Sequence, residues 1–440
     1  MPVYTSEFVV DSAEYPPIKP SLNLNFAGSK SIGDGFQFTR LHSPAFIKVG
    51  CVNKAGLVEM LGAHQPRFEH DPLTRECIGL DFEQSVENLL TASININNAL
   101  SSSTNVVFNS NTPDTPSPDG QFNANKVTDG TNNGVHHFSF TGSHASAATT
   151  TVSIWAKRGS AQTVRLHLSG GNNYGGQNPY IYCNLSTGQV TDYNATNVDA
   201  YGMIEYPNGW YRCWMTATSS GAEGTTFYIM PANNFQTYTG TGAFIYLWGP
   251  QLCRSWLGPY VETGWNGNNQ VGVVGVDYLR HLNADDFYTP DGGTWIIEAQ
   301  GPRNKAITGT NHHLIQLAPS SNLQDQSYQV RFDGATKPTT WGSLTSAVDQ
   351  WNINTSNSNP NYVTGQLYKI GLRVKQNDVA FYVDGNQVGT DTSVSLREDI
   401  RKLQVGSTID GSQPMSGAIR SIKFYPAHLS NAQLAHLTQA

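Results

Sequence analysis

Aromatic side chains lie among amides and hydroxyls at two places in this sequence, and such mixtures suit sugar recognition. Flat rings stack on sugar faces, while amides hydrogen-bond to sugar hydroxyls. The first place is the loop GGNNYGGQNPYIY, with Asn173, Tyr174 and Tyr180. The second is the stretch 336–362, with Trp341, Trp351 and Tyr362. We expect the first group to be glycan candidates on a loop, and the second to lie on an exposed loop, where its rings either contact a neighbouring subunit or bind glycan, with simple packing as the remaining alternative.

A third aromatic group, YPNGWYRCWMTAT at 206–218, follows an Asn-Gly turn. In a strand, Trp210, Arg212 and Trp214 share one face, whereas Tyr211 and Cys213 share the other. The rings are therefore either a sugar platform or part of the buried face of a β-sandwich.

Catalytic patterns are scarce. The sequence has no HExxH, no Walker loop and no nucleophile elbow. The pairs Asp285–Asp286 and Glu83–Glu87 resemble glycosidase carboxylates only in residue type, because sequence does not set their separation. Adjacent strand residues point to opposite faces, so neither His136–His137 nor His312–His313 can chelate one metal. We therefore expect a protein that is not an enzyme and has no catalytic metal.

Composition excludes several other classes. Of the 440 residues only 13% are charged, and the net charge of −7 comes without a basic block, which argues against nucleic-acid binding. No apolar run approaches the roughly 20 residues of a membrane helix, and the N-terminus does not read as a secretory signal. The five cysteines form no CxxC motif. We expect them to be reduced, in a protein made in a cytoplasm.

The elements that must position these residues are strands. Short runs bounded by Gly, Asn or Ser fill residues 121–265, and a second series begins near 284. The clearest runs are LYKIGLRV and VAFYV, which alternate apolar and polar residues on either side of a KQND turn. A single short helix is predicted after Ser430, its expected N-cap.

These patterns predict an all-β protein: a small N-terminal attachment block, two antiparallel β-sandwich (jelly-roll) domains and one short C-terminal helix. The predicted boundaries are an arm at 1–20, a block at 21–90, a sandwich at 91–265, a linker at 266–283 and a second sandwich at 284–440.

Residues 21–90 resemble an N-terminal module of bacteriophage tail and virion proteins. The pattern is carried by PSLNLNF, NKAGLVEM and QPRFEHDPLTRECIGLDFEQSVENLL. The resemblance marks Pro66, Arg67, Phe68, Asp71 and Asn88 as residues of a virion-attachment block. The chain departs from the module where a usual arginine is replaced by Val86.

Two further stretches carry resemblances. TVSIWAKRG, NGWYRCWMT and AFIYLWGPQL look like the carbohydrate-binding-module-like jelly roll of such phage proteins, in which the Asn-Gly-Trp-Tyr-Arg motif is structural. Residues 367–434 are similar to a laminin-G or concanavalin-A-like domain. Both families often hold a structural Ca²⁺, for which Asp119, Asp129 or Asp384 could supply ligands.

The resemblances imply a bacteriophage virion protein, most simply a tail fibre or receptor-binding protein that contacts host cell-surface polysaccharide. The expected partners are other virion proteins and further copies of the chain, with a trimer as the guess, and neither nucleic acid nor membrane. A capsid decoration protein is the alternative, and a polysaccharide depolymerase is a second one.

Overall fold

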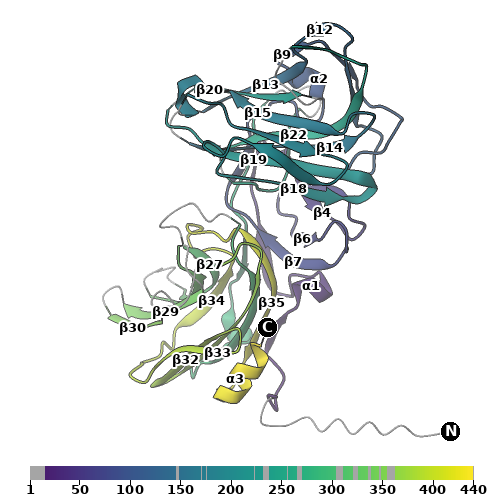
Figure 1. Cartoon of the computed structure of the whole chain (residues 1–440). Helices are drawn as coiled ribbons and strands as arrows, with labels where there is room; N and C mark the ends of the chain where they lie inside the picture. Colours follow the sequence, from purple (N-terminus) through teal and green to yellow (C-terminus); the bar gives the residue numbers. More distant parts are fainter. Residues whose placement is uncertain are drawn as a thin grey trace, which may run out of the picture. The chain divides into compact units, whose positions relative to one another are not determined.

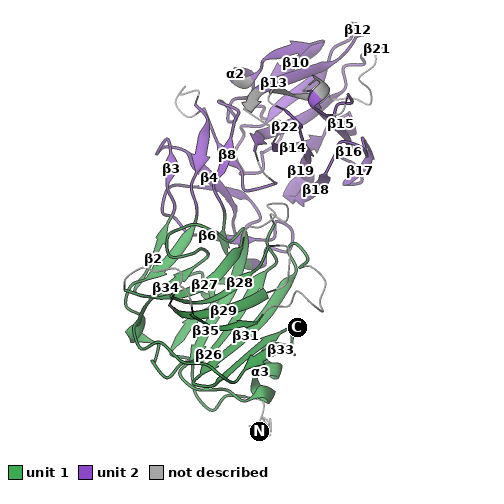
Figure 2. Ribbon diagram, turned by 90° about the vertical axis from the view of Figure 1, so that its left-hand side faces the viewer, with its two compact units in different colours: residues 1–39, 78–83, 277–440 green, residues 40–77, 84–276 purple. Residues whose placement is uncertain are grey.

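The computed structural model describes residues 15–144, 148–169, 171–174, 176–221, 223–230, 237–254, 256–264, 270–303, 311–320, 326–334, 338–345, 348–353 and 362–439. The chain divides into two compact units (Figure 2). Unit 1 comprises residues 1–39, 78–83 and 277–440, and unit 2 comprises residues 40–77 and 84–276.

Unit 1 is built on two antiparallel sheets (Figure 1). The first has the order β33 (Asn386–Asp391), β32 (Asp378–Val383), β31 (Leu367–Lys375), β26 (Gly293–Gln300), β35 (Gly417–Tyr425) and β7 (Cys77–Phe82), with β1 (Leu22–Leu24) also on β35. The second has the order β2 (Phe36–Thr39), β25 (Tyr278–His281), β34 (Ile400–Val405), β27 (His312–Pro319), β28 (Tyr328–Phe332), β29 (Pro338–Thr345) and β30 (Val348–Ile353).

Aromatic contacts join the two sheets of unit 1. Phe332 on β28 packs against Tyr368 on β31, with ring centroids 5.7 Å apart, and Phe38 on β2 lies 6.5 Å from Phe82 on β7. The predicted hairpin is present: β31 turns into β32 through Asn377, whose φ of 56° is the left-handed geometry that a tight turn needs. The core of unit 1 thus lies between its sheets.

The C-terminal helix α3 (Asn431–Leu437) begins as predicted. The Ser430 side chain accepts a hydrogen bond from the Gln433 backbone N–H, and the Gln433 side chain accepts one from Ser430 N–H, which completes a capping box. Two four-residue helices, α1 (Phe26–Ser29) and α2 (Ile96–Ala99), were not predicted. Among the described residues, no helix has the length and apolarity needed to cross a bilayer.

Unit 2 contains a second sandwich. One sheet has the order β10 (Val106–Asn109), β11 (Asn125–Asp129), β22 (Phe244–Cys253), β14 (Thr149–Arg158), β19 (Trp210–Thr218) and β18 (Ala200–Tyr206). The other has the order β17 (Gln189–Tyr193), β16 (Tyr180–Asn184), β15 (Thr163–Ser169), β20 (Glu223–Met230), β13 (His137–His144) and β9 (Ser102–Thr104). Val152 and Cys213 of the first sheet share a core cluster with Leu166 and Ile181 of the second.

The outer face of β14 and β19 carries a second core. Trp155 and Trp210 are fully buried there, with Val52 and Val58 of β4 (Lys48–Val52) and β5 (Val58–Leu61) in the same cluster. Trp210 Nε1–H donates to the Pro116 carbonyl (2.9 Å). The aromatic group at 206–218 is therefore structural at Trp210, as the resemblance implied, while Trp214 stays half-buried.

Short strands complete unit 2. A three-stranded sheet has the order β23 (Val261–Glu262), β4 and β5, and another has the order β3 (His42–Ser43), β24 (Gly272–Val274) and β8 (Val86–Asn88). β12 (Asn133–Gly134) pairs with β21 (Tyr238–Thr239). β6 (Arg67–His70) contributes His70, whose Nδ1 lies 2.9 Å from the Val52 carbonyl oxygen.

The all-β prediction with two antiparallel sandwiches and a short C-terminal helix is confirmed. Residues 21–90 do not stay together, however, because β1, β2 and most of β7 belong to unit 1 whereas β3–β6 and β8 belong to unit 2. The stretch 266–283, expected as a linker, contains β24 and β25. The arm expected at 1–20 lies mostly outside the described residues.

Candidate functional site

A row of polar side chains crosses the second sheet of unit 1 on the side away from its core. Cross-strand partners share a face, and the register joins Gln404 to Gln316, Gln316 to Gln329, Gln329 to Trp341 and Trp341 to Asn352. Val330 and Phe332, which alternate with these positions on β28, are buried. The row therefore lies on the outer face of β34, β27, β28, β29 and β30.

A loop after β34 holds one end of this row. Gln404 Nε2 donates to Ser407 Oγ (2.7 Å), and Gln316 Oε1 accepts from the Ile409 backbone N–H (2.6 Å). Gln316 Nε2 also donates to Ser327 Oγ (2.9 Å). Both glutamine side chains are fully buried, so this end of the row is structural.

The other end reaches the surface. Trp341 is half-buried, Asn352 is exposed, and Arg331 reaches Gln329 through Nη1, which donates to Gln329 Oε1 (2.9 Å). We call Gln329, Arg331, Trp341 and Asn352 the Trp341 face. It combines one half-buried indole with the exposed amide of Asn352 and the guanidinium of Arg331, while the buried Gln329 side chain holds Arg331 in place. Arg331 also lies 3.7 Å from Asp333, so the local charge is nearly balanced.

A neutral histidine borders the Trp341 face. Burial, together with the nearby positive charge of Arg331 as the second cause, lowers the pKa of His313 to about 3. His313 Nε2 lies 3.1 Å from Gln413 Oε1. At neutral pH the imidazole is therefore uncharged and offers one donor and one acceptor.

Two residues predicted for an exposed loop in this region are core residues instead. Trp351 on β30 is 1% exposed, stacks near Tyr328 with centroids 4.8 Å apart, and donates from Nε1 to Thr340 Oγ1 (3.2 Å). Tyr362 is fully buried against Phe332. Residues 338–345 and 348–353 form strands, whose alternation turns Trp351 inward and Trp341 outward. The prediction of exposure was wrong for Trp351 and Tyr362.

The three residues predicted for a recognition loop in unit 2 also differ in their burial. Tyr174 is buried in the sandwich core, and its carbonyl oxygen accepts from Asn197 Nδ2 (2.6 Å). The Asn173 carbonyl oxygen accepts from the Ser220 backbone N–H (2.9 Å), so this residue connects two loops. Tyr180 is half-buried on β16, on the side away from the core residue Ile181. Of the three, Tyr174 is a core residue, whereas Asn173 and Tyr180 are half-buried.

The residues marked for virion attachment have mainly structural contacts. Arg67 is fully buried. Asn88, also fully buried, donates from Nδ2 to the carbonyls of Pro250 and Val261, and its Oδ1 accepts from the N–H groups of Leu90 and Leu252. Asp71 accepts from the N–H groups of Leu73 and Thr74, which lowers the pKa of its carboxyl. Pro66 and Phe68 are half-buried.

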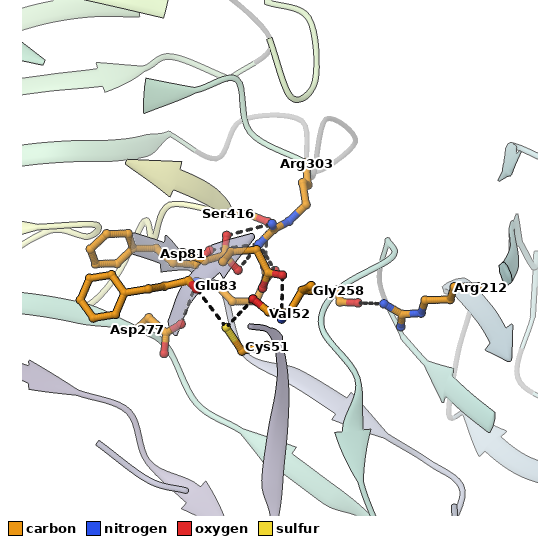
Figure 3. Close-up of polar contacts among 12 residues, drawn as sticks. Cys51, Val52, Asp81, Glu83, Arg212, Gly258, Asp277, Arg303 and Ser416 are labelled. Carbon is orange, nitrogen blue, oxygen red and sulfur yellow. Dashed lines mark hydrogen bonds and ion pairs between the residues drawn. The ribbon is translucent and has the colours of Figure 1, made fainter. Parts of the chain in front are cut away.

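The two members of the predicted pair Glu83–Glu87 have separate partners, since Glu87 lies 3.5 Å from Arg254 whereas Glu83 belongs to a cluster around Arg303. Arg303 donates to Asp81 (2.8 Å) and to Glu83 (3.0 Å), and Ser416 Oγ donates to Glu83 Oε1 (2.7 Å) (Figure 3). The side chains of Asp81 and Glu83 are nearly buried, so this cluster ties β7 to the sandwich of unit 1. Asp285 and Asp286, in contrast, are exposed, as expected for solvent-facing carboxylates.

The aspartates named for Ca²⁺ are engaged in protein contacts. Asp119 accepts from Ser117 Oγ and Asn123 Nδ2, Asp129 pairs with His136 and accepts from the Tyr238 hydroxyl, and Asp384 accepts from the Lys369 N–H. Within the described residues, no three His, Cys, Asp or Glu side chains are grouped so as to hold a metal ion. All five cysteines lie among the described residues and are buried thiols.

Sequence reasoning found Trp341 but missed Gln329, Arg331 and Asn352. The run YQVRF does alternate polar and apolar residues, which places Gln329 and Arg331 on one face. The register between the strands could not be predicted, because no local sequence pattern pairs Gln329 with Trp341 or Trp341 with Asn352.

Comparison with known proteins agrees with the fold of unit 1. A family model described as the Concanavalin A-like lectin/glucanases superfamily (Laminin_G_3) matches residues 303–435. No curated protein matched the chain.

Solved structures similar to parts of the chain include three carbohydrate-related or pentraxin proteins. The CBM40 of a Ruminococcus gnavus IT-sialidase, bound to α2,3-sialyllactose, is 14% identical over 34% of this chain and 84% of that one, with a TM-score of 0.29. Domain 4 of the Geobacillus stearothermophilus arabinanase AbnA, with arabinotriose, is 15% identical over 37% and 73%, with a TM-score of 0.30. A SAP-like pentraxin of Limulus polyphemus is 14% identical over 36% and 73%, with a TM-score of 0.26. On the family match, residues 303–435 have a concanavalin A-like lectin fold.

Proposed function

We propose that this protein binds carbohydrate through the Trp341 face of unit 1. The observation that carries the proposal is the register that places the half-buried indole of Trp341 between the amides of Gln329 and Asn352. An indole presents a flat apolar surface to the C–H face of a sugar ring. The Asn352 amide and Arg331 supply donors and acceptors beside that surface for hydroxyl groups, and the buried Gln329 side chain holds Arg331 in place.

The near balance of charge on the Trp341 face indicates a neutral sugar. Arg331 is the cation of the face, and Asp333 lies beside it. His313 is uncharged at neutral pH because burial lowers its pKa to about 3. A neutral hexose or pentose unit would meet hydrogen-bonding groups there without bringing an unpaired charge.

Glycan-array screening with neutral polysaccharides, followed by titration calorimetry, tests the proposal. Trp341→Ala should weaken binding by at least about tenfold, since a central aromatic contact contributes roughly 2 kcal/mol or more. Phe122→Ala is the matched control, because Phe122 is 59% exposed and belongs to unit 2. Equal affinity of Trp341→Ala and wild type, or no neutral-glycan binding by folded protein, would overturn the assignment.

We further propose that the protein is a non-enzymatic virion protein of a bacteriophage, made in the host cytoplasm, that contacts host surface glycans as a tail fibre or receptor-binding protein. The support is the resemblance of residues 21–90 to phage virion proteins, together with the lectin fold of 303–435. As a fibre component it would bind other virion proteins and assemble as a homotrimer. A bound polysaccharide would keep its chain length during incubation.

Immunogold labelling of intact particles with antibody against residues 284–440 tests this setting. Label at the tail is the expected result. Label spread over the head would replace the receptor-binding role with capsid decoration, and unlabelled particles would overturn the virion assignment. Shortening of the polysaccharide during incubation would overturn the non-enzymatic role.

A further inference from the structure

Strand β18 forms one margin of the first sheet of unit 2. Every residue of this strand, Ala200–Tyr206, is paired with β19, and the register has no shift along its length. Within the part of the chain that the structure describes, no strand pairs with the opposite side of β18. The backbone N–H and C=O groups on that side can therefore pair with an additional strand.

The other marginal strands of this sandwich have features that discourage such pairing, whereas β18 has few. Strands β9 and β10 are short, and β17 carries Asp192 beside a shift in its register with β16. Strand β18 contains no proline, and its one charged residue is Glu205. Tyr201 is 38% exposed and Ile204 is 36% exposed. Regular margins with exposed apolar side chains are typical of sites at which strands of two chains pair.

We propose that β18 pairs with β18 of a second copy of this chain, in antiparallel orientation, around a two-fold axis that passes through Met203. Such an axis is perpendicular to the sheet, so residues directly opposite one another lie on the same face of a sheet that continues from one copy into the other. Tyr201 then lies opposite Glu205 of the second copy, and Gly202 lies opposite Ile204 of the second copy.

The charges near β18 favour this register over its neighbours. With the axis at Met203, the Glu205 carboxylate faces a tyrosine side chain. An axis at Gly202 would place Glu205 opposite Asp199 of the second copy, and like charges directly opposite are unfavourable. An axis at Ile204 would place Tyr201 opposite Pro207, which has no N–H to donate.

The side chains on one face of the proposed pairing are also complementary. Gly202 lies opposite Trp214 of β19, and a Cβ added to Gly202 would be 2.9 Å from Trp214 Nε1. The indole therefore lies against this glycine, and Trp214 remains half-buried. Ile204 of the second copy would approach Gly202 from the free side of β18 and cover more of the indole. The two-fold axis makes this contact occur twice.

Sedimentation velocity of the full-length protein over a range of concentrations tests the proposal. A two-fold contact joins chains in pairs, so the particle should contain an even number of chains. The expected particle is a dimer or, if the homotrimer proposed above also forms, a pair of trimers. Monomers or single trimers at every concentration would overturn the proposal.

A charge exchange tests the register. Tyr201→Glu should weaken the pairing by at least about tenfold, because a second carboxylate then faces Glu205 at both symmetric positions. Adding Glu205→Lys to Tyr201→Glu should restore the pairing, since opposite charges then face each other. If Tyr201→Glu associates like wild type, or if the double variant stays dissociated, β18 does not pair in this register and the proposal fails.

Two further variants separate this contact from a general effect of surface charge. Ile204→Lys changes an exposed side chain and should also weaken the pairing by at least about tenfold, because it removes the apolar contact with Trp214 twice. Val107→Glu is the matched control, since Val107 is 56% exposed on β10, at the other margin of the same sheet. It should leave the association unchanged. Equal association of Ile204→Lys and Val107→Glu would also count against pairing through β18.

Discussion

At the scale of single residues, the buried histidines set the response of the protein to acid. Burial lowers the pKa of both His167 and His313 to about 3, against an ordinary value of 6.5. Each lies beside an arginine, Arg165 or Arg331, whose charge opposes a second positive charge. Because the unfolded chain has no such environment, it takes up protons at these two positions at a higher pH than the folded protein does.

The contribution of these two neutral histidines to the free energy of unfolding should therefore be fully present above pH 6.5. It should be lost as the pH falls toward 3. Between those values each histidine costs about 1.4 kcal/mol per pH unit, because the unfolded state is protonated there and the native state is not. We expect His313→Gln to reduce the stability difference between pH 7.5 and pH 5.0 by about 2 kcal/mol, measured by urea unfolding.

An exposed residue without a titratable group provides the control for this experiment. Phe122 is 59% exposed, so Phe122→Ala should leave the same pH dependence unchanged. If the loss of stability on acidification is as large in His313→Gln as in wild type, then His313 is already protonated in the native state, and its proposed role as a neutral neighbour of the Trp341 face fails.

At the scale of elements, strand β7 is attached to unit 1 by charge as well as by backbone pairing. Leu80, Asp81 and Phe82 pair with Ile419, Ala418 and Gly417 of β35. Arg303 then spans Asp81 and Glu83, both of which are nearly buried. Two nearly buried carboxylates thus share the positive charge of one arginine, and that arginine is itself only 30% exposed.

Arg303→Gln should destabilise unit 1 by about 3 kcal/mol, because it removes the positive charge that pairs with two nearly buried carboxylates. Thermal unfolding followed by calorimetry measures the loss. Arg401→Gln is the control, since the Arg401–Asp285 pair is exposed on both sides and should contribute less than about 1 kcal/mol. Similar losses in the two variants would mean that the carboxylates of β7 remain solvated, contrary to their burial.

Local pattern predicted those elements whose partners are close in sequence. The hairpin of β31 and β32 and the cap of α3 at Ser430 follow from alternation and capping residues within a few positions. The same alternation separated the two faces of β19 but did not show which of them is buried, and in the structure each face contributes to a core cluster. It could not show that Leu22 pairs with Phe424, because that register depends on tertiary packing. Trp351 was misplaced for a related reason, since nothing in its polar surroundings indicates the sheet that buries it.

At the scale of the whole molecule, the course of the chain makes the N-terminal segment part of the C-terminal sandwich. The chain leaves unit 1 after residue 39, returns for residues 78–83 and returns again at residue 277. Strand β1 pairs with β35, and β2 pairs with β25, so both contacts span hundreds of residues. Folding of unit 1 therefore needs both ends of the chain, a feature associated with slow folding.

Removal of residues 1–39 deletes no residue of unit 2. It should consequently destabilise unit 1 and leave the stability of unit 2 unchanged. The truncation removes the buried side chains Leu22, Leu24, Phe26, Phe36 and Phe38, each of which contributes roughly 1.5–3 kcal/mol. It also uncovers the backbone edges of β25 and β35. Calorimetry of residues 40–440 should show the transition of unit 1 lowered or absent and that of unit 2 retained.

Phe26→Ala makes the same test without shortening the chain, and under the proposed virion role it separates folding from attachment to particles. Phe26 is fully buried, and its truncation should cost unit 1 about 3 kcal/mol or more. If particle incorporation falls in Phe26→Ala in proportion to the loss of unit 1, the N-terminal segment acts through the fold. If residues 40–440 melt like the full chain but no longer join particles, β1 and β2 are dispensable for folding, and the first 39 residues are an attachment element in their own right.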